Sequence, residues 1–339
     1  MRDYFFRRLL LVIPTLIGIT LLVFAVTRLV PGGPLERALM EAQQSALASG
    51  AAPAAGEGMA LSEAQIQQLA EYYGFDKPWY LSYVDWLGKV VRGDLGQSYR
   101  YHQPVWDVIR ERFPVSLFFG LTSLVITYLV CIPLGVVKAI RHRTFIDNVT
   151  SIIIFTGYAV PGYVLGALLL LFFAAEVQWF PMGGFTSLHF DELSFWGKTK
   201  DLLHHATLPL ICYLVGSFAV TTLLMKNNLM DNLAADYVRT ALAKGVSFEG
   251  AVYGHALRNS LIPIATTFGQ NITLLVSGSF LIETIFDIDG FGLLGLNSIF
   301  DRDYPVVMGV VLLASLLLLI GNILSDLLVA LVDPRIRFQ

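Results

Sequence analysis

The sequence carries little charge, and that scarcity excludes several classes of protein. Only 14% of its 339 residues are charged, whereas 55% are hydrophobic, and the mean hydropathy is +0.64. A soluble domain of this length exposes far more charge, so a large soluble core is excluded. The net charge of −3 argues against a nucleic-acid partner. The two cysteines, Cys131 and Cys212, lie in apolar runs and indicate no disulfide framework.

Motifs for catalysis and for metal binding are also missing. The chain has no GxxxxGK[ST], HExxH or GxSxG motif, so it cannot hydrolyse ATP by the P-loop route. Gly290-Phe-Gly-Leu-Leu-Gly295 matches GxGxxG, but it follows an apolar run rather than a strand. A tight turn that glycine permits is therefore the better interpretation. His204 and His205 are adjacent and lack the spacing of a helical metal pair. We expect no catalytic residue and no metal site.

Long hydrophobic runs are what the sequence has in abundance. A bilayer core is crossed by about 20 apolar residues in a helix. Six runs reach this length: residues 9–30, 115–137, 149–173, 208–225, 264–286 and 306–331. The third and fifth also contain small and polar residues, which suits closely packed helices. The expected fold is an all-α integral membrane protein with six transmembrane helices.

A polar insert of residues 31–114 separates the first two runs. Its first part, residues 38–60, is rich in Ala, Gly and Gln and is expected to be a flexible linker. The part from 62 to 112 is expected to be helical, because Ser62 and Gln65 form a capping box and Pro78 and Pro104 can each open a further helix. Those further helices are expected over 79–91 and 105–112. The remaining divisions are residues 1–30, with the N-terminus and first span, a membrane core over 115–332, and a tail over 333–339.

Basic residues predict the orientation in the membrane. The segments assigned to the inside contain Arg2, Arg7, Arg8, Lys138, Arg141, Arg143, Lys226, Arg239, Lys244, Arg258, Arg335 and Arg337. The two short outer loops contain only Lys198, Lys200 and Arg302 among many acids. The positive-inside rule therefore places both termini in the cytoplasm and the insert outside.

One hydrophilic stretch lies between two strongly apolar runs. It reads Asp236-Tyr-Val-Arg-Thr-Ala-Leu-Ala-Lys-Gly245 and continues as His255-Ala-Leu-Arg-Asn-Ser-Leu-Ile-Pro263. Thr240 and Ala241 are small enough to let another surface approach, and Gly245 is expected to end the first helix. A short cytosolic helix, break and helix of this kind, over residues 232–262, could receive force from a soluble partner.

Polar residues within the predicted spans have two possible roles. Glu283 and Asp326 are costly in lipid, so each needs a partner or a wet cavity. Buried hydrogen bonds between helices are one interpretation, and the polar wall of a transport path or gate is the other. The residues concerned are Gln270, Asn271, Ser277, Glu283, Asn322 and Asp326.

Several motifs occur in an order that resembles a known family. Arg7-Arg-Leu-Leu-Leu-Val-Ile-Pro-Thr15 and Pro31-Gly-Gly-Pro34 are followed by Tyr73-Gly-Phe-Asp-Lys-Pro78 and Gly93-Asp-Leu-Gly-Gln-Ser98. Later come Thr240-Ala-Leu-Ala-Lys-Gly245, His255-Ala-Leu-Arg-Asn259, Ile282-Glu-Thr-Ile-Phe286 and Asp333-Pro-Arg335. Over nearly its full length the chain resembles the B-type permease of oligopeptide, dipeptide and nickel ABC importers. The insert, Pro181-Met-Gly-Gly184 and Arg302-Asp-Tyr-Pro305 are most similar to the YejB-type branch, which is associated with longer peptides and microcin C.

The resemblance implies a type I importer fold in a bacterial inner (plasma) membrane and a set of partners. These are a second related permease, two ATP-binding domains or one fused double domain that hold ATP and Mg, and an extracytoplasmic peptide-binding protein. The expected residues for contact with the ATPase are Asp236, Arg239, Thr240, Ala241, Lys244 and Gly245. The strict coupling motif has Glu-Ala-Ala where this chain has Arg239-Thr-Ala241, which leaves the contacting residue open. Alternatives are a dipeptide or nickel importer permease and an ion-coupled secondary transporter.

Overall fold

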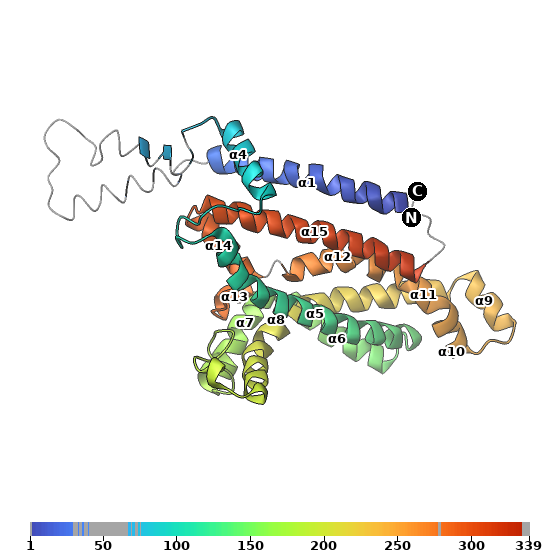
Figure 1. Ribbon diagram of the computed structural model, residues 1–339. Helices are drawn as coiled ribbons and strands as arrows, with labels where there is room; N and C mark the ends of the chain where they lie inside the picture. The colour runs from blue at the N-terminus through green and yellow to red at the C-terminus, as the bar shows by residue number, and fades with distance from the viewer. Residues whose placement is uncertain are drawn as a thin grey trace. The chain divides into compact units, whose positions relative to one another are not determined.

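A computed structural model describes residues 2–29, 76–276 and 279–333, with isolated positions between 33 and 74 (Figure 1). In this part of the chain the regular structure is helical, and strand-type pairing is limited to one bridge between Gln97 and Pro104. The expected all-α class is therefore confirmed.

Among the residues that the structure describes, four helices are long and apolar enough to cross a membrane. They are α1 (Arg2–Leu29), α5 (Val105–Ile140), α8 (Phe195–Leu233) and α15 (Tyr304–Val332). A fifth candidate is a bent pair made of α6 (Phe145–Ala159) and α7 (Gly162–Leu169), which continues as the π-helix η1 (Leu170–Glu176). The shorter elements are the 3₁₀-helix η2 (Phe190–Glu192), α12 (Ile262–Val276), α13 (Phe280–Ile285) and α14 (Phe291–Phe300). The chain is an all-α integral membrane protein.

Two expected spans are not single helices. The run 149–173 is bent by 91° at Pro161, because a proline drives the residue before it out of the helical region, and Val160 is extended at φ −95°, ψ 120°. The run 264–286 ends its first helix at Val276 and resumes at Phe280, where the Ser279 hydroxyl caps the new helix by accepting a hydrogen bond from the Ile282 N–H at 3.5 Å. The count of six crossings stays a prediction.

The chain divides into two compact units. The first comprises residues 1–12, 111–294 and 314–339. Its core includes Phe119 stacked on Tyr213, with ring centroids 5.8 Å apart, and the buried Phe286. Here α12 lies against α15: a Cβ on Gly269 would be 2.0 Å from the Gly321 carbonyl oxygen. Small residues thus bring backbones together, as the sequence predicted for this run.

The second unit comprises residues 13–110 and 295–313. Its core forms where α4 (Trp79–Val91) packs on α1: the Tyr83 ring lies 5.4 Å from Phe24, and its hydroxyl donates to the Ile17 carbonyl at 3.1 Å. The predicted bounds of this helix, 79–91, are confirmed. The helix expected over 105–112 is the first part of α5. The predicted linker 38–60 and capping box at Ser62 lie outside the described residues.

Candidate functional site

The hydrophilic stretch forms two helices joined by a glycine turn. After α8 ends at Leu233, α9 runs over Asp236–Ala243. Gly245 then adopts φ +86°, and its N–H donates to the Leu242 carbonyl at 2.9 Å while the Val246 N–H donates to the Ala241 carbonyl at 3.2 Å. This pair of bonds is the Schellman arrangement that ends a helix at a left-handed glycine. The helix break predicted at Gly245 is confirmed.

The next helix starts at once. The Ser247 hydroxyl accepts a hydrogen bond from the Gly250 N–H at 3.2 Å and so caps α10 (Phe248–Ala251). The helix continues through the π-helical turn η3 (Val252–Ala256) into α11 (Leu257–Ser260). The segment α9–α11 is therefore a helix-turn-helix (Figure 1).

The two sides of α9 differ sharply. Val238 and Ala241 are buried, and Val238 belongs to a core cluster with Met225 and Leu229 of α8 and Val252 of η3. The other predicted contact residues are exposed: Asp236, Arg239, Thr240, Lys244 and Gly245. Ala241 is buried within its own chain, so its side chain seats α9 instead of presenting a surface. The other five lie where a partner could reach them.

Hydrogen bonds that the sequence did not suggest hold this segment in place. The Tyr237 hydroxyl donates to Asn232 Oδ1 at 2.6 Å and accepts from Asn259 Nδ2 at 3.1 Å, which joins α9 to α11. Arg258 Nε donates to the Val332 carbonyl at the end of α15, at 2.6 Å. Arg258 and Asn259 lie in one of the sequence motifs, but their partners, Val332 and Tyr237, are distant in sequence, so the motif alone does not predict these bonds.

Glu283 is fully buried and hydrogen-bonded. Its Oε1 accepts from the Ser116 hydroxyl at 2.7 Å, and its Oε2 accepts from the Leu293 N–H in the first turn of α14 at 2.6 Å. A carboxylate is stabilised at a helix N-terminus by the free N–H groups and the helix dipole. A Cβ on Gly290 would lie 2.5 Å from the Glu283 carboxyl carbon, so the glycine of the GxGxxG match leaves room for this acid. Of the two roles left open, the geometry favours buried hydrogen bonding.

The other polar candidates are dispersed. Asp326 pairs with Arg8 and accepts from the Tyr4 hydroxyl at 3.1 Å. Asn271 Nδ2 donates to the Tyr128 hydroxyl at 2.9 Å, Gln270 is exposed and Asn322 is half-buried. Ser277 lies outside the described residues. No common polar site joins these residues within the first unit as described.

A buried ion cluster joins three helices. Lys226 of α8 donates to both carboxylate oxygens of Asp147 of α6 at 2.8 Å, and Lys138 of α5 lies 3.0 Å from Asp147 Oδ1. Lys138 and Asp147 are inaccessible to solvent or nearly so, and Lys226 is 8% exposed. In the sequence, both lysines are recognisable only as basic residues that mark the inner side. The buried role depends on residues 79 positions apart, which no local pattern connects.

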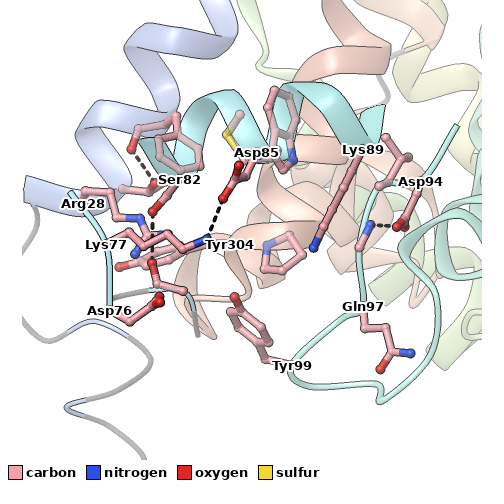
Figure 2. Close-up of a pocket in the computed structure, with 18 of the residues that line it drawn as sticks. Arg28, Asp76, Lys77, Ser82, Asp85, Lys89, Asp94, Gln97, Tyr99 and Tyr304 are labelled. Carbon is pink, nitrogen blue, oxygen red and sulfur yellow. Dashed lines mark hydrogen bonds and ion pairs between the residues drawn. The ribbon is translucent and has the colours of Figure 1, made fainter. Parts of the chain in front are cut away.

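The second unit contains a polar cavity of about 740 Å³. Figure 2 shows Arg28 and Lys89 among its labelled residues, with Lys77 hydrogen-bonded to Asp85 at 2.8 Å. That hydrogen bond lowers the pKa of the Asp85 carboxyl, so it stays ionised in mildly acidic surroundings. Beside the cavity, buried Asp303 accepts from the Ser98 hydroxyl and from the Tyr99 N–H at 3.1 Å. This contact joins the insert motif at 93–98 to the motif at 302–305.

Groups of His, Cys, Asp or Glu that could hold a metal ion are absent from the residues the structure describes. The candidate site is an exposed helix, α9, that packs through buried residues at the end of the membrane helix α8.

Comparison with known proteins identifies the family of this helical membrane protein. Residues 131–338 match the family described as "Binding-protein-dependent transport system inner membrane component". The chain belongs to this family of permeases.

Named relatives match over the whole chain. The peptidoglycan transport system permease protein YejB of Agrobacterium fabrum is 38% identical, covering 100% of this chain and 99% of the relative. The inner membrane ABC transporter permease protein YejB of Escherichia coli O157:H7 is 38% identical, with 100% of both chains covered. The oligopeptide transport system permease protein AppB of Bacillus subtilis is 35% identical, also with 100% of both covered.

Proposed function

We propose that this chain is the membrane-spanning permease subunit of an ATP-driven importer of oligopeptides, and that α9 and the turn at Gly245 dock into its ATPase. The observation that carries the proposal is the two-sided packing of α9, buried at Val238 and Ala241 and exposed at Asp236, Arg239 and Thr240. Similarity to permeases named for oligopeptide and dipeptide transport supports the substrate class.

The proposed complex has further parts. A second, related permease forms a heterodimer with this chain and encloses the peptide path, to which exposed Gln270 is a candidate contributor. ATP and Mg bind the ATPase, as two chains or one fused chain. Both termini and α9–α11 face the cytoplasm, and an extracytoplasmic binding protein delivers peptide to the insert. The charged cavity of the insert, with Arg28, Lys77 and Lys89, supports a polar contact there. The peptide then passes by alternating access.

The test is reconstitution of the co-expressed subunits in liposomes. We expect uptake of a radiolabelled hexapeptide that requires ATP, the ATPase and the binding protein, with a dipeptide and nickel ion as competing substrates. Replacing Arg239 and Lys244 together by Glu should reduce co-purification of the ATPase, because both side chains are exposed on the docking side. The matched control replaces Lys198 and Lys200, on the far end of α8, in the same way. Uptake driven by an ion gradient without ATP would contradict the proposal.

A further inference from the structure

The Lys138–Asp147–Lys226 cluster holds the start of α6 to two other helices. Besides the carboxylate, Lys138 Nζ contacts three oxygens of α6 at 2.8 Å: the Asp147 carbonyl, Thr150 Oγ1 and Ser151 Oγ. The Arg143 N–H donates to Asp147 Oδ2 at 3.0 Å. Every ammonium and carboxylate group in the cluster has a charged partner, as buried ions require. The register of α6 on α5 and α8 is therefore set by directional bonds.

The same two helices also form the seat of α9. Next to the cluster, α5 and α8 approach so closely that a Cβ on Gly135 would be 2.6 Å from Met225 Cβ. Met225 precedes Lys226, and with Leu229 it packs in the core that contains Val238 of α9 and Val252 of η3. Val136 and Ala139, on either side of Lys138, belong to that core as well. A displacement of α9 therefore acts directly on the helix positions that carry the two lysines.

Apolar packing alone would not hold α6 in this way. Helices in lipid gain no hydrophobic driving force from contact with one another, so their association depends on close packing and polar bonds. Along α6, residues such as Ile152, Ile153 and Phe155 are exposed, whereas Asp147, Thr150 and Ser151 are bonded to Lys138. The first turns of α6 are thus held to α5 and α8 by the polar cluster, in addition to their packing on α8.

At its other end α6 leads into the bend. Beyond Pro161, Gly162 of α7 packs against the Cys212 carbonyl of α8, 2.8 Å from where a Cβ would be, and Gly166 lies against Phe286. The two halves of this bent span are therefore attached separately. The half with α6 is attached by the ion cluster in addition to its packing on α8, and the half with α7 by close backbone contact.

We propose that Lys138, Asp147 and Lys226 transmit the movement of α9 to α6, and that Asp147 and Lys226 are positioning residues that couple ATP hydrolysis to peptide passage. This inference rests on the proposed function. It assigns no contact with substrate or ATPase to these residues. If this link is lost, the ATPase should still dock, but ATP should be hydrolysed without peptide import.

The decisive variant is Lys226→Gln in the full reconstituted complex. Lys138 and Asp147 still balance each other in this variant, and the neutral glutamine amide can still donate to Asp147, so the fold survives while the ionic link to α8 is lost. We expect wild-type co-purification of the ATPase, with ATP consumed per peptide imported raised on the order of tenfold, whereas Lys226→Arg stays within about twofold because the guanidinium keeps the charge and can bind both carboxylate oxygens. Lys198→Gln, on the same helix as Lys226, loses an exposed pair with Asp191 of η2; it is the control and should not change the ratio.

The outcomes separate the two proposals. If the wild-type chain does not retain the ATPase, the proposed function fails. If it does, and Lys226→Gln couples as well as wild type, only the present inference is overturned. It is also overturned if Lys226→Arg is as uncoupled as Lys226→Gln, or if uptake and ATP hydrolysis fall together in proportion to the assembled complex, since these results indicate a structural role alone.

Discussion

At the scale of single residues, the acids in the membrane helices form bonds within the chain. Glu283 accepts from Ser116 and from the first turn of α14, and Asp326 pairs with Arg8. A charge in this setting is stabilised by its donors and by the dipole of the helix that it caps. Such residues stabilise the protein where they are fully partnered, and no proton has to move for them to do so.

Glu283→Gln is therefore expected to import peptide at close to the wild-type rate. The amide oxygen can accept from the Leu293 N–H while its NH₂ group donates to Ser116 Oγ, and loss of the charge costs about 0.3–1 kcal/mol of helix-dipole stabilisation. Glu283→Leu should lower the unfolding temperature of the purified protein, because it leaves the buried Leu293 N–H without an acceptor. Uptake and thermal unfolding in detergent are the measurements. Loss of uptake in the Gln variant with unchanged stability would identify Glu283 as part of a gate instead.

At the scale of elements, α9 is defined by its turn as much as by its helix. Gly245 is in the left-handed region, and a Cβ there would meet no atom within 4 Å. Side chains at this position would therefore extend into open space and meet only a partner. A residue other than glycine or asparagine also strains the backbone there by roughly 1–2 kcal/mol.

Gly245→Trp should therefore leave membrane insertion intact but separate ATP hydrolysis from uptake, since the bulky ring occupies the surface that α9 offers. The measurements are the amount of protein in the membrane, ATPase rate and hexapeptide uptake. Gly245→Asn is the matched control, because asparagine tolerates the left-handed conformation, and it should retain most activity. Normal peptide uptake by the Trp variant would show that Gly245 does not belong to the docking surface.

Elements differ in how far the sequence predicts them. Hydropathy locates α1, α5, α8 and α15, and Pro78 places the start of α4, because these signals are local. The division of residues 264–286 into α12 and α13 was not predicted, because the small and polar residues of this run indicate close packing of helices as readily as a break. Lys138 and Lys226 were predicted only to mark the inner side, since their burial depends on Asp147, a partner supplied by tertiary packing. The helix break at Gly245 was predictable because a glycine directly after a helical segment is a local signal.

At the scale of the whole molecule, the two native cysteines allow the orientation to be tested. Cys131 and Cys212 are both buried, so labels added from either side of the membrane should find little to react with. Thr240 is exposed on α9 and Leu188 is fully exposed before α8. These two positions lie on segments that the charge distribution assigns to opposite sides.

We expect Thr240→Cys to react with a membrane-impermeant maleimide only after the cells are opened, and Leu188→Cys to react in intact spheroplasts. The unmodified chain serves as the background control. The positive-inside argument requires this result, since the basic residues near Thr240 include Arg239 and Lys244. Labelling of Thr240→Cys in intact spheroplasts would invert the orientation and contradict docking to a cytoplasmic ATPase.

The two hydrogen bonds that Glu283 accepts also bear on biogenesis. Its donors come from residue 116, synthesised long before it, and from residue 293, which leaves the ribosome after it. Until translation has passed Leu293, the Glu283 carboxylate of the nascent segment has only one of these two hydrogen-bond donors. The insertion machinery must therefore shelter this segment through that interval, and premature release there would strand a charged side chain in the bilayer.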